Sequence, residues 1–368
     1  MLRLPQASDY TARALPPNPF SASDLPQLYA AFDLCLYLEA RAHLVPLPDP
    51  NHPSVVVCAR VLGFTLTEAS DEGRDHMAQA IGSGSTDNTL LALGKYYIQH
   101  LLRVFKSHKG RTPAPSEHPS RPDLDDVQEF CKFILEQASL NHSTAKAAAL
   151  VRDGFHCMIK TNLYDAQYFE RNRSTIIAQD PEWDVGTLRW AHIFPEGLNS
   201  DLGGIEVPSD KREWVASVWA VMYMFGIHME ELNGTGIHRL ENILTLSPSL
   251  QDFFDQSALW FEAVENQPNT YTIVSTISSV LERLPSRVVT FTTPNTNVLP
   301  LPSPAYLAIH AACCRVAHLS GAAEYVEKVL REEEEIRERM GSMCTLAEDG
   351  SSMDLFGQYI DNIAVQGV

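Results

Sequence analysis

Two residues whose types suit proton transfer or metal binding stand in short segments that alternate between apolar and polar side chains. His192 lies in the segment 188–194, and it shares one side of a predicted strand with Leu188, Trp190 and Phe194. Asn242 opens the segment 242–246, which is followed by Ser247 and Pro248, a pair typical of a helix start. Imidazole changes its charge near neutral pH and is a common metal ligand. The pattern therefore predicts two strands and a helix that present a histidine and an asparagine.

Two further groups of residues have suitable types, but their spacing favours a structural role. His156 and Cys157 are sequence neighbours, which rarely form a nucleophile and its base. His310 and Cys314 stand four residues apart in a predicted helix, where further ligands would be needed to hold a metal. We predict that Cys157 is a buried structural cysteine and that His310 and Cys314 belong to the core. The sequence has no glycine-rich phosphate loop and no G-x-S-x-G or H-E-x-x-H motif.

The composition is that of a folded protein with an acidic surface. The chain has 368 residues, 45% of them hydrophobic, and a formal net charge of −18, which disfavours an extended basic face for nucleic acid. Its seven cysteines are scattered and form no C-x-x-C pair, so we expect a reducing compartment and no structural zinc. The first residues show no charged region followed by an apolar run, and no apolar run approaches about 18 residues, so we expect neither secretion nor a membrane span. We expect an intracellular protein, in the nucleus or cytoplasm, without a membrane partner.

Apolar periodicity predicts a mostly helical chain with a few short strands. The predicted helices are 28–42, 89–105, 124–138, 144–153, 210–232, 304–320 and 322–340, with a further helix starting at Pro248. The predicted strands are 155–161, 188–194, 242–246, 271–275 and 287–292. The segment 55–64 is apolar and fits either a strand or a buried helix.

A proline-rich segment with several basic residues divides the chain. Lys106, Lys109, Arg111 and Arg121 fall within or beside it. Such a segment is either a solvated connector or an arm that contacts the phosphates of a nucleic acid. If the protein binds nucleic acid, we expect weak, salt-sensitive binding through these four residues.

Several motifs occur in an order that resembles the HNH endonuclease-like proteins common in basidiomycete fungi. The segment 149–157 (A-L-V-R-D-G-F-H-C) is followed by 191–195 (A-H-I-F-P), then by 241–246 (E-N-I-L-T-L) and Phe254-Asp255. Flanking segments around Gly94, Lys109 and Ala305 extend the resemblance over most of residues 55–335. The resemblance implies an α+β fold, with a small ββα-metal (HNH-like) core in a mostly helical chain.

The sequence patterns predict an irregular leader (1–27), a helical N-terminal domain (28–110), a basic linker (111–123), C-terminal helices (294–341) and a tail (342–368), and the resemblance assigns an HNH-like nuclease domain to residues 124–293. The resemblance also implies a chemistry. The implied activity is metal-assisted hydrolysis of phosphodiester bonds in nucleic acid, with DNA as the expected substrate. His192 would be the general base, and Asn242 would fix the hairpin and orient it.

Two positions depart from the pattern that the resemblance implies. Gln251 stands where the helix normally supplies a histidine to a divalent ion such as Mg²⁺ or Mn²⁺, and Ala191 stands where many such enzymes carry an aspartate. Asp255 lies one helical turn after Gln251, so this pair is the expected metal site, and His238 and Glu241 are further candidates. No nucleotide cofactor is expected. The alternatives are a catalytically inactive HNH fold that binds a protein partner, and an unrelated helical scaffold.

Overall fold

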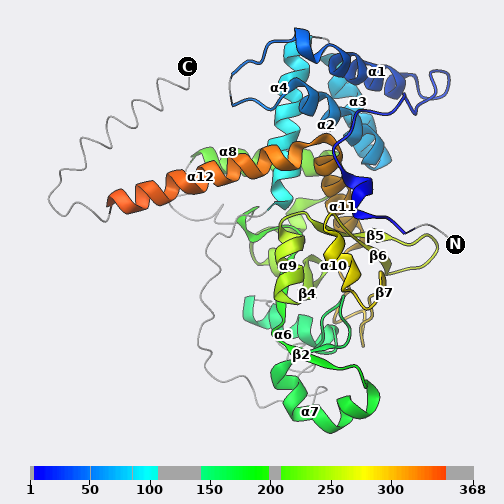
Figure 1. Cartoon of the computed structure of the whole chain (residues 1–368), viewed down its shortest axis with the longest axis vertical. Coiled ribbons are helices and arrows are strands. Elements are labelled where there is room, and N and C mark those ends of the chain that lie inside the picture. Colours follow the sequence, from blue (N-terminus) through cyan, green and yellow to red (C-terminus); the bar gives the residue numbers. More distant parts are fainter. Residues whose placement is uncertain (1–3, 50, 85, 107–141, 199–208, 345–368) are drawn as a thin grey trace. The chain divides into compact units, whose positions relative to one another are not determined.

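The computed structural model describes residues 4–49, 51–84, 86–106, 142–198 and 209–344 (Figure 1). The described residues up to Ala322 form one compact unit, and those from Ala323 belong to a second. Both helices and small sheets are present, so the α+β class expected from the sequence holds at this level. Within the described residues, no helix is both long and apolar enough to cross a membrane.

The N-terminal part of the first unit is helical and is centred on one buried helix. The helices are η1 (Ala7–Tyr10), α1 (Pro26–Ala40), η2 (Ala42–Leu44), α2 (Val55–Glu68), α3 (Asp71–Ser83) and α4 (Asp87–Tyr97). Helix α4 continues as a π-helical turn, η3 (Ile98–Leu102), and a 3-10 turn, η4 (Arg103–Phe105). The side chains of Ser54, Ser70 and Thr86 cap α2, α3 and α4 by accepting backbone N–H groups.

Helix α2 resolves the alternative that the sequence left open for residues 55–64. It contacts α1, α3, α4 and the later helix α11 (Pro304–Ser320). Because helices surround it, most of its length is buried and the apolar residues are not confined to one stripe. At the crossing with α4, a Cβ on Gly94 would lie 2.7 Å from the Cβ of Cys58, so a side chain there would force the helices apart.

The middle of the chain holds the elements that the HNH resemblance concerns. They are α6 (His142–Arg152), β1 (Leu163–Asp165), α7 (Ala166–Gln179), β2 (Asp184–Gly186), β3 (Arg189–His192), η5 (Glu196–Leu198), α8 (Ser209–Met224), η6 (Met229–Leu232), η7 (Gly234–His238), η8 (Leu240–Asn242), β4 (Ile243–Leu246) and α9 (Pro248–Asp255). Strands β1 and β2 pair in parallel, and β3 and β4 pair antiparallel. The sequence order β3, β4, α9 agrees with the strand–strand–helix order predicted from the sequence.

Two predicted elements in this region are wrong in extent. Residues 155–161 do not form a strand, because Gly154 and Phe155 both take positive φ angles (61° and 58°) and turn the chain back after α6. The helix predicted over 210–232 ends at Met224, Gly226 takes a positive φ of 75°, and a run of short 3-10 turns begins at Met229. The predicted helix 124–138 lies outside the described residues.

The C-terminal part of the first unit adds an antiparallel sheet and a buried helix. Its strands are β5 (Leu259–Ala263), β6 (Thr270–Ser275) and β7 (Val288–Thr290), with the short helix α10 (Ser278–Glu282) between the last two. Strand β5 was not predicted from the sequence. Helix α11 packs on both β5 and α2, and so joins the sheet to the N-terminal helices. Helix α12 (Ala322–Cys344) makes up the described part of the second unit.

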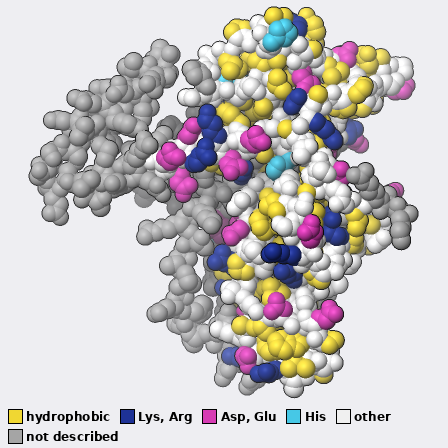
Figure 2. All heavy atoms as spheres, viewed as in Figure 1, with side chains coloured by type: hydrophobic (Ala, Val, Ile, Leu, Met, Phe, Trp, Pro, Cys, Tyr) yellow, Lys and Arg dark blue, Asp and Glu magenta, His cyan; other side chains and the backbone are white. Residues whose placement is uncertain are grey.

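The surface in view shows acidic and basic side chains interspersed over the described residues (Figure 2). They do not gather there into a single basic field, in keeping with the net charge of −18.

Candidate metal centre

The β3–β4 hairpin brings His192 and Asn242 together, as predicted from the sequence. His192 pairs with Ile243 across the strands, and the next residue, Ile193, donates its N–H to the carbonyl of Asn242 at 2.9 Å. The two candidates are therefore separated by one step of the ladder.

Asn242 is completely buried, and its side-chain amide connects two chain segments. Its Oδ1 accepts the N–H of Phe194 at 2.8 Å, and its Nδ2 donates to the carbonyls of Phe194 (3.0 Å) and Ile237 (2.9 Å). These bonds hold the chain that leaves β3 against the chain that enters β4. This arrangement agrees with the predicted role of Asn242 in fixing the hairpin, in which it would act on His192 through the backbone.

His192 lies in a cluster with a glutamate and a second histidine. Its Nε2 is 3.3 Å from Nδ1 of His238, and its Nδ1 is 3.5 Å from Oε1 of Glu196. Nδ1 of His238 is 3.8 Å from the same glutamate oxygen. The side chains of His192 and His238 are 9% and 16% exposed, whereas that of Glu196 is 44% exposed. The cluster is thus walled by protein on the histidine side and open to solvent at the carboxylate.

The spacing and chemistry of this cluster suit a divalent metal ion. One ligand atom from each residue falls within a set no more than 4.8 Å across. Two ligands of a tetrahedral ion, each about 2.1 Å from the metal, lie about 3.4 Å apart. Nδ1 of His238 is 3.3 Å and 3.8 Å from its two neighbours, close to that value. Two imidazoles and one carboxylate favour a borderline ion such as Zn²⁺ or Mn²⁺ over Mg²⁺, and they leave coordination positions open.

Three short segments supply the ligands. His192 ends β3, Glu196 opens η5 after Pro195, and His238 ends η7. The approach to η7 needs glycine, because Gly234 has a φ of 60° and a Cβ on Gly236 would lie 2.3 Å from the carbonyl oxygen of Glu231. His238 was a further candidate from the sequence. Glu196 was missed, although its position four residues after His192 is a signal that local spacing offers.

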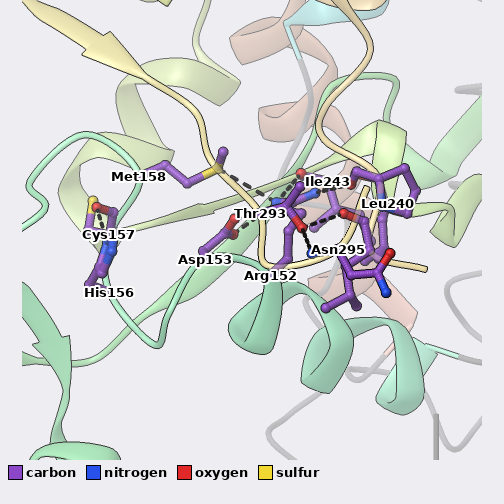
Figure 3. A network of polar contacts seen from close by, with 11 residues as sticks. Arg152, Asp153, His156, Cys157, Met158, Leu240, Ile243, Thr293 and Asn295 are labelled. Carbon is purple, nitrogen blue, oxygen red and sulfur yellow. Dashed lines mark hydrogen bonds and ion pairs between the residues drawn. The ribbon is translucent and has the colours of Figure 1, made fainter. Parts of the chain in front are cut away.

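A buried arginine holds the segment that carries Asn242 (Figure 3). Arg152, at the end of α6, donates two hydrogen bonds to the carboxylate of Asp153, at 2.7 and 2.9 Å. It also donates to the carbonyls of Leu240 (2.7 Å) and Ile243 (2.9 Å), which lie on either side of Asn242. The Arg152 and Asp153 side chains are 0% and 1% exposed. Arg152 and Asp153, the R-D pair of the sequence motif, therefore hold the backbone on both sides of Asn242.

The expected metal ligands Gln251 and Asp255 are not members of the cluster of His192, Glu196 and His238. Gln251 is partly buried, and its Nε2 donates to the carbonyl of Trp190 at 3.2 Å, tying α9 to β3. Its Oε1 is buried and has no hydrogen-bond partner among the described residues. Asp255, at the end of α9, is not among the three clustered ligands. Glu241 instead pairs with Arg239 at 3.1 Å.

Ala191 also differs from its expected setting. It is 1% exposed and, by strand alternation, faces away from the side of β3 that carries His192. An aspartate at this position would enter the core and would not be a ligand beside Gln251.

Only one of the four basic linker residues lies within the described part of the chain. Lys106 follows η4 and is partly exposed. Lys109, Arg111 and Arg121 lie outside the described residues.

Cys157, His310 and Cys314 are buried core residues, as predicted, whereas His156 is partly exposed. His310 is fully buried and stacks on Phe254 at 4.1 Å, and burial lowers its imidazole pKa to about 3. Burial also raises the pKa of the Cys314 thiol to about 12 and raises the pKa of Cys157. These raised values favour the protonated thiol at neutral pH, and the thiol is a much weaker nucleophile than the thiolate.

Comparison with protein-family models, with curated proteins and with solved structures gave no match for this chain, so the functional assignment rests on its own residues.

Proposed function

We propose that this protein is a metal-dependent phosphodiesterase of the HNH type that acts on nucleic acid, and that His192, Glu196 and His238 hold its divalent ion. The observation that carries the proposal is the convergence of these three ligands at the end of the β3–β4 hairpin. The strand–strand–helix order and the motifs quoted above support the same assignment.

The proposal changes the division of roles that the resemblance implies. His192 becomes a metal ligand, and its distance to Glu196 and His238 supports this role over that of an isolated base. When bound, the ion would lower the pKa of a coordinated water and offset charge on the phosphate. Glu196, the exposed member, marks the side from which a phosphodiester would approach. Asn242 and Arg152 keep the ligand-bearing segments in register.

A second candidate is an inactive HNH fold that serves as a binding module. It is favoured by Gln251, whose amide is used to tie α9 to β3 and adds no charged ligand. The net charge of −18 points the same way, because it opposes general affinity for nucleic acid.

Metal binding and DNA cleavage separate the two candidates. The purified chain is titrated with Mn²⁺, Zn²⁺ and Mg²⁺ by calorimetry and is incubated with supercoiled plasmid in the presence of each metal. The test variants are His192→Ala and His238→Ala. The matched control is His228→Ala, because His228 is an exposed histidine outside the cluster.

The active-enzyme proposal expects metal binding and nicking that both test variants lose and the control keeps. Metal binding without nicking favours the inactive module. Wild-type protein that binds none of the three metals contradicts the metal centre itself.

A further inference from the structure

A lysine and a tryptophan form a fixed cationic contact beside the candidate metal centre. The Nζ of Lys146, on α6, lies 4.1 Å from the centroid of the Trp190 ring, on β3. At this distance the ammonium is attracted to the face of the indole. The ring therefore restricts where the lysine charge can stand, although both side chains remain partly exposed.

The tryptophan is itself held from two sides. Its carbonyl accepts the Gln251 amide at 3.2 Å, which fixes the backbone of β3 to α9. Its ring packs against the buried cluster under α6 that includes Ala145, Leu240 and Ile243. Because the ring cannot turn freely, the lysine lies over a rigid support.

The strand places this contact next to the metal ligands. Trp190 and His192 are two residues apart on β3, so their side chains point to the same face. Two residues of a strand span about 6.6 Å. A nucleic-acid strand with one phosphate at the His192 cluster would therefore have further phosphates within reach of Lys146.

We infer that Lys146, supported by Trp190, is a second phosphate-binding position for the DNA strand that enters the site. This inference rests on the proposed function for the choice of ligand. A local cation is significant in a chain with a net charge of −18, because charges farther away than about 8 Å are largely screened at physiological salt.

The test measures the affinity of the full chain for a fluorescein-labelled single-stranded DNA 20-mer by anisotropy, from 50 to 200 mM KCl. EDTA is present throughout, so that binding is read without the metal. The variants are Lys146→Met, Lys146→Arg and Trp190→Leu. The control is Lys160→Met, which removes a partly exposed lysine of the same unit. Circular dichroism and thermal unfolding confirm that each variant is folded.

Lys146→Met is expected to weaken binding at 50 mM KCl. The negative slope of log affinity against log salt should become shallower by about 0.7, the value for one phosphate contact with a single strand. Lys146→Arg should restore the wild-type slope, Trp190→Leu should weaken binding with the slope retained in part, and Lys160→Met should change neither quantity. An unchanged slope in Lys146→Met, or the same loss in Lys160→Met, overturns the inference. No binding of the 20-mer by wild type overturns it as well.

This outcome is distinguishable from failure of the proposed function. Metal titration of His238→Ala tests the metal centre without DNA, whereas the anisotropy assay tests Lys146 without metal. The inference stands or falls on the second measurement alone, whatever the plasmid assay shows.

Discussion

Replacing Arg152 by methionine tests how strongly the buried ion pair supports the hairpin. The methionine keeps most of the side-chain volume but removes every donor of the guanidinium. The change leaves the Asp153 carboxylate, with a side chain that is 1% exposed, without its cationic partner. It also removes the donor to the carbonyls of Leu240 and Ile243.

The expected cost is large because the lost partner is buried. Breaking a buried ion pair from one side typically costs 3–5 kcal/mol, since an uncompensated charge remains inside the protein. An orphaned buried carbonyl costs about 1–3 kcal/mol, but the two effects share one network and do not add. We therefore expect Arg152→Met to lower the free energy of unfolding by about 4 kcal/mol. Many domains have only about 5–15 kcal/mol in total.

Urea unfolding followed by tryptophan fluorescence and circular dichroism measures this loss. Arg239→Met is the control, because Arg239 makes two ion pairs, to Glu231 at 2.8 Å and Glu241 at 3.1 Å, but is 36% exposed. Exposed pairs are worth about 0–1 kcal/mol, so the control should cost little. Hydrogen exchange adds a local measurement, and the amides of Ile193 and Phe194 should exchange faster in Arg152→Met.

A result in which Arg152→Met and Arg239→Met cost the same would refute this reasoning. It would mean that the carboxylate of Asp153 finds water or another donor once the guanidinium is gone. A double variant, Arg152→Met with Asp153→Asn, should recover part of the loss because no charge is then left buried.

Three further predictions concern pH, packing and the metal site. His310 has a pKa of about 3 in the folded protein and about 6.5 when unfolded, so the stability that the neutral imidazole contributes is complete above pH 6.5 and is lost as the pH falls towards 3. At pH 5 the free energy of unfolding should be about 2 kcal/mol lower than at neutral pH. Urea midpoints at pH 7 and pH 5 measure this loss, which should be absent in His310→Leu. Gly94→Ala should lower the unfolding temperature, because the added Cβ would lie 3.0 Å from the backbone and 2.7 Å from the Cβ of Cys58. If the variant unfolds at the same temperature as wild type, α2 and α4 can move apart at no cost and the prediction is wrong. Gln251→His should not tighten Mn²⁺ binding, because Gln251 is not one of the three clustered ligands and its amide bonds the carbonyl of Trp190; tighter binding of the folded variant by calorimetry contradicts this. Ala191→Asp should reduce stability because the position is 1% exposed, and an Ala191→Asp variant as stable as wild type contradicts this.

The sequence by itself determined the elements whose signals are local. Helices α1 and α11 follow from apolar periodicity, and α9 follows from the Ser247-Pro248 start. The alternation around His192 and Asn242 predicted the strands β3 and β4. Such signals need only a few neighbouring residues, because they depend on the repeat of the helix or strand itself.

Only the tertiary structure decided which side chains meet. His238 reaches His192 through a turn that depends on the positive φ of Gly234 and on close packing at Gly236, which periodicity does not report. Arg152 reaches across 88 residues to Leu240, and no local pattern indicates that contact. Helix α2 and strand β5 are apolar on nearly every side because other elements surround them, so the alternation that normally separates helix from strand is lost. An element that is buried on all sides has no polar face, so its sequence shows no alternation between apolar and polar residues. The secondary structure of α2 and β5 could therefore be assigned only from the tertiary structure.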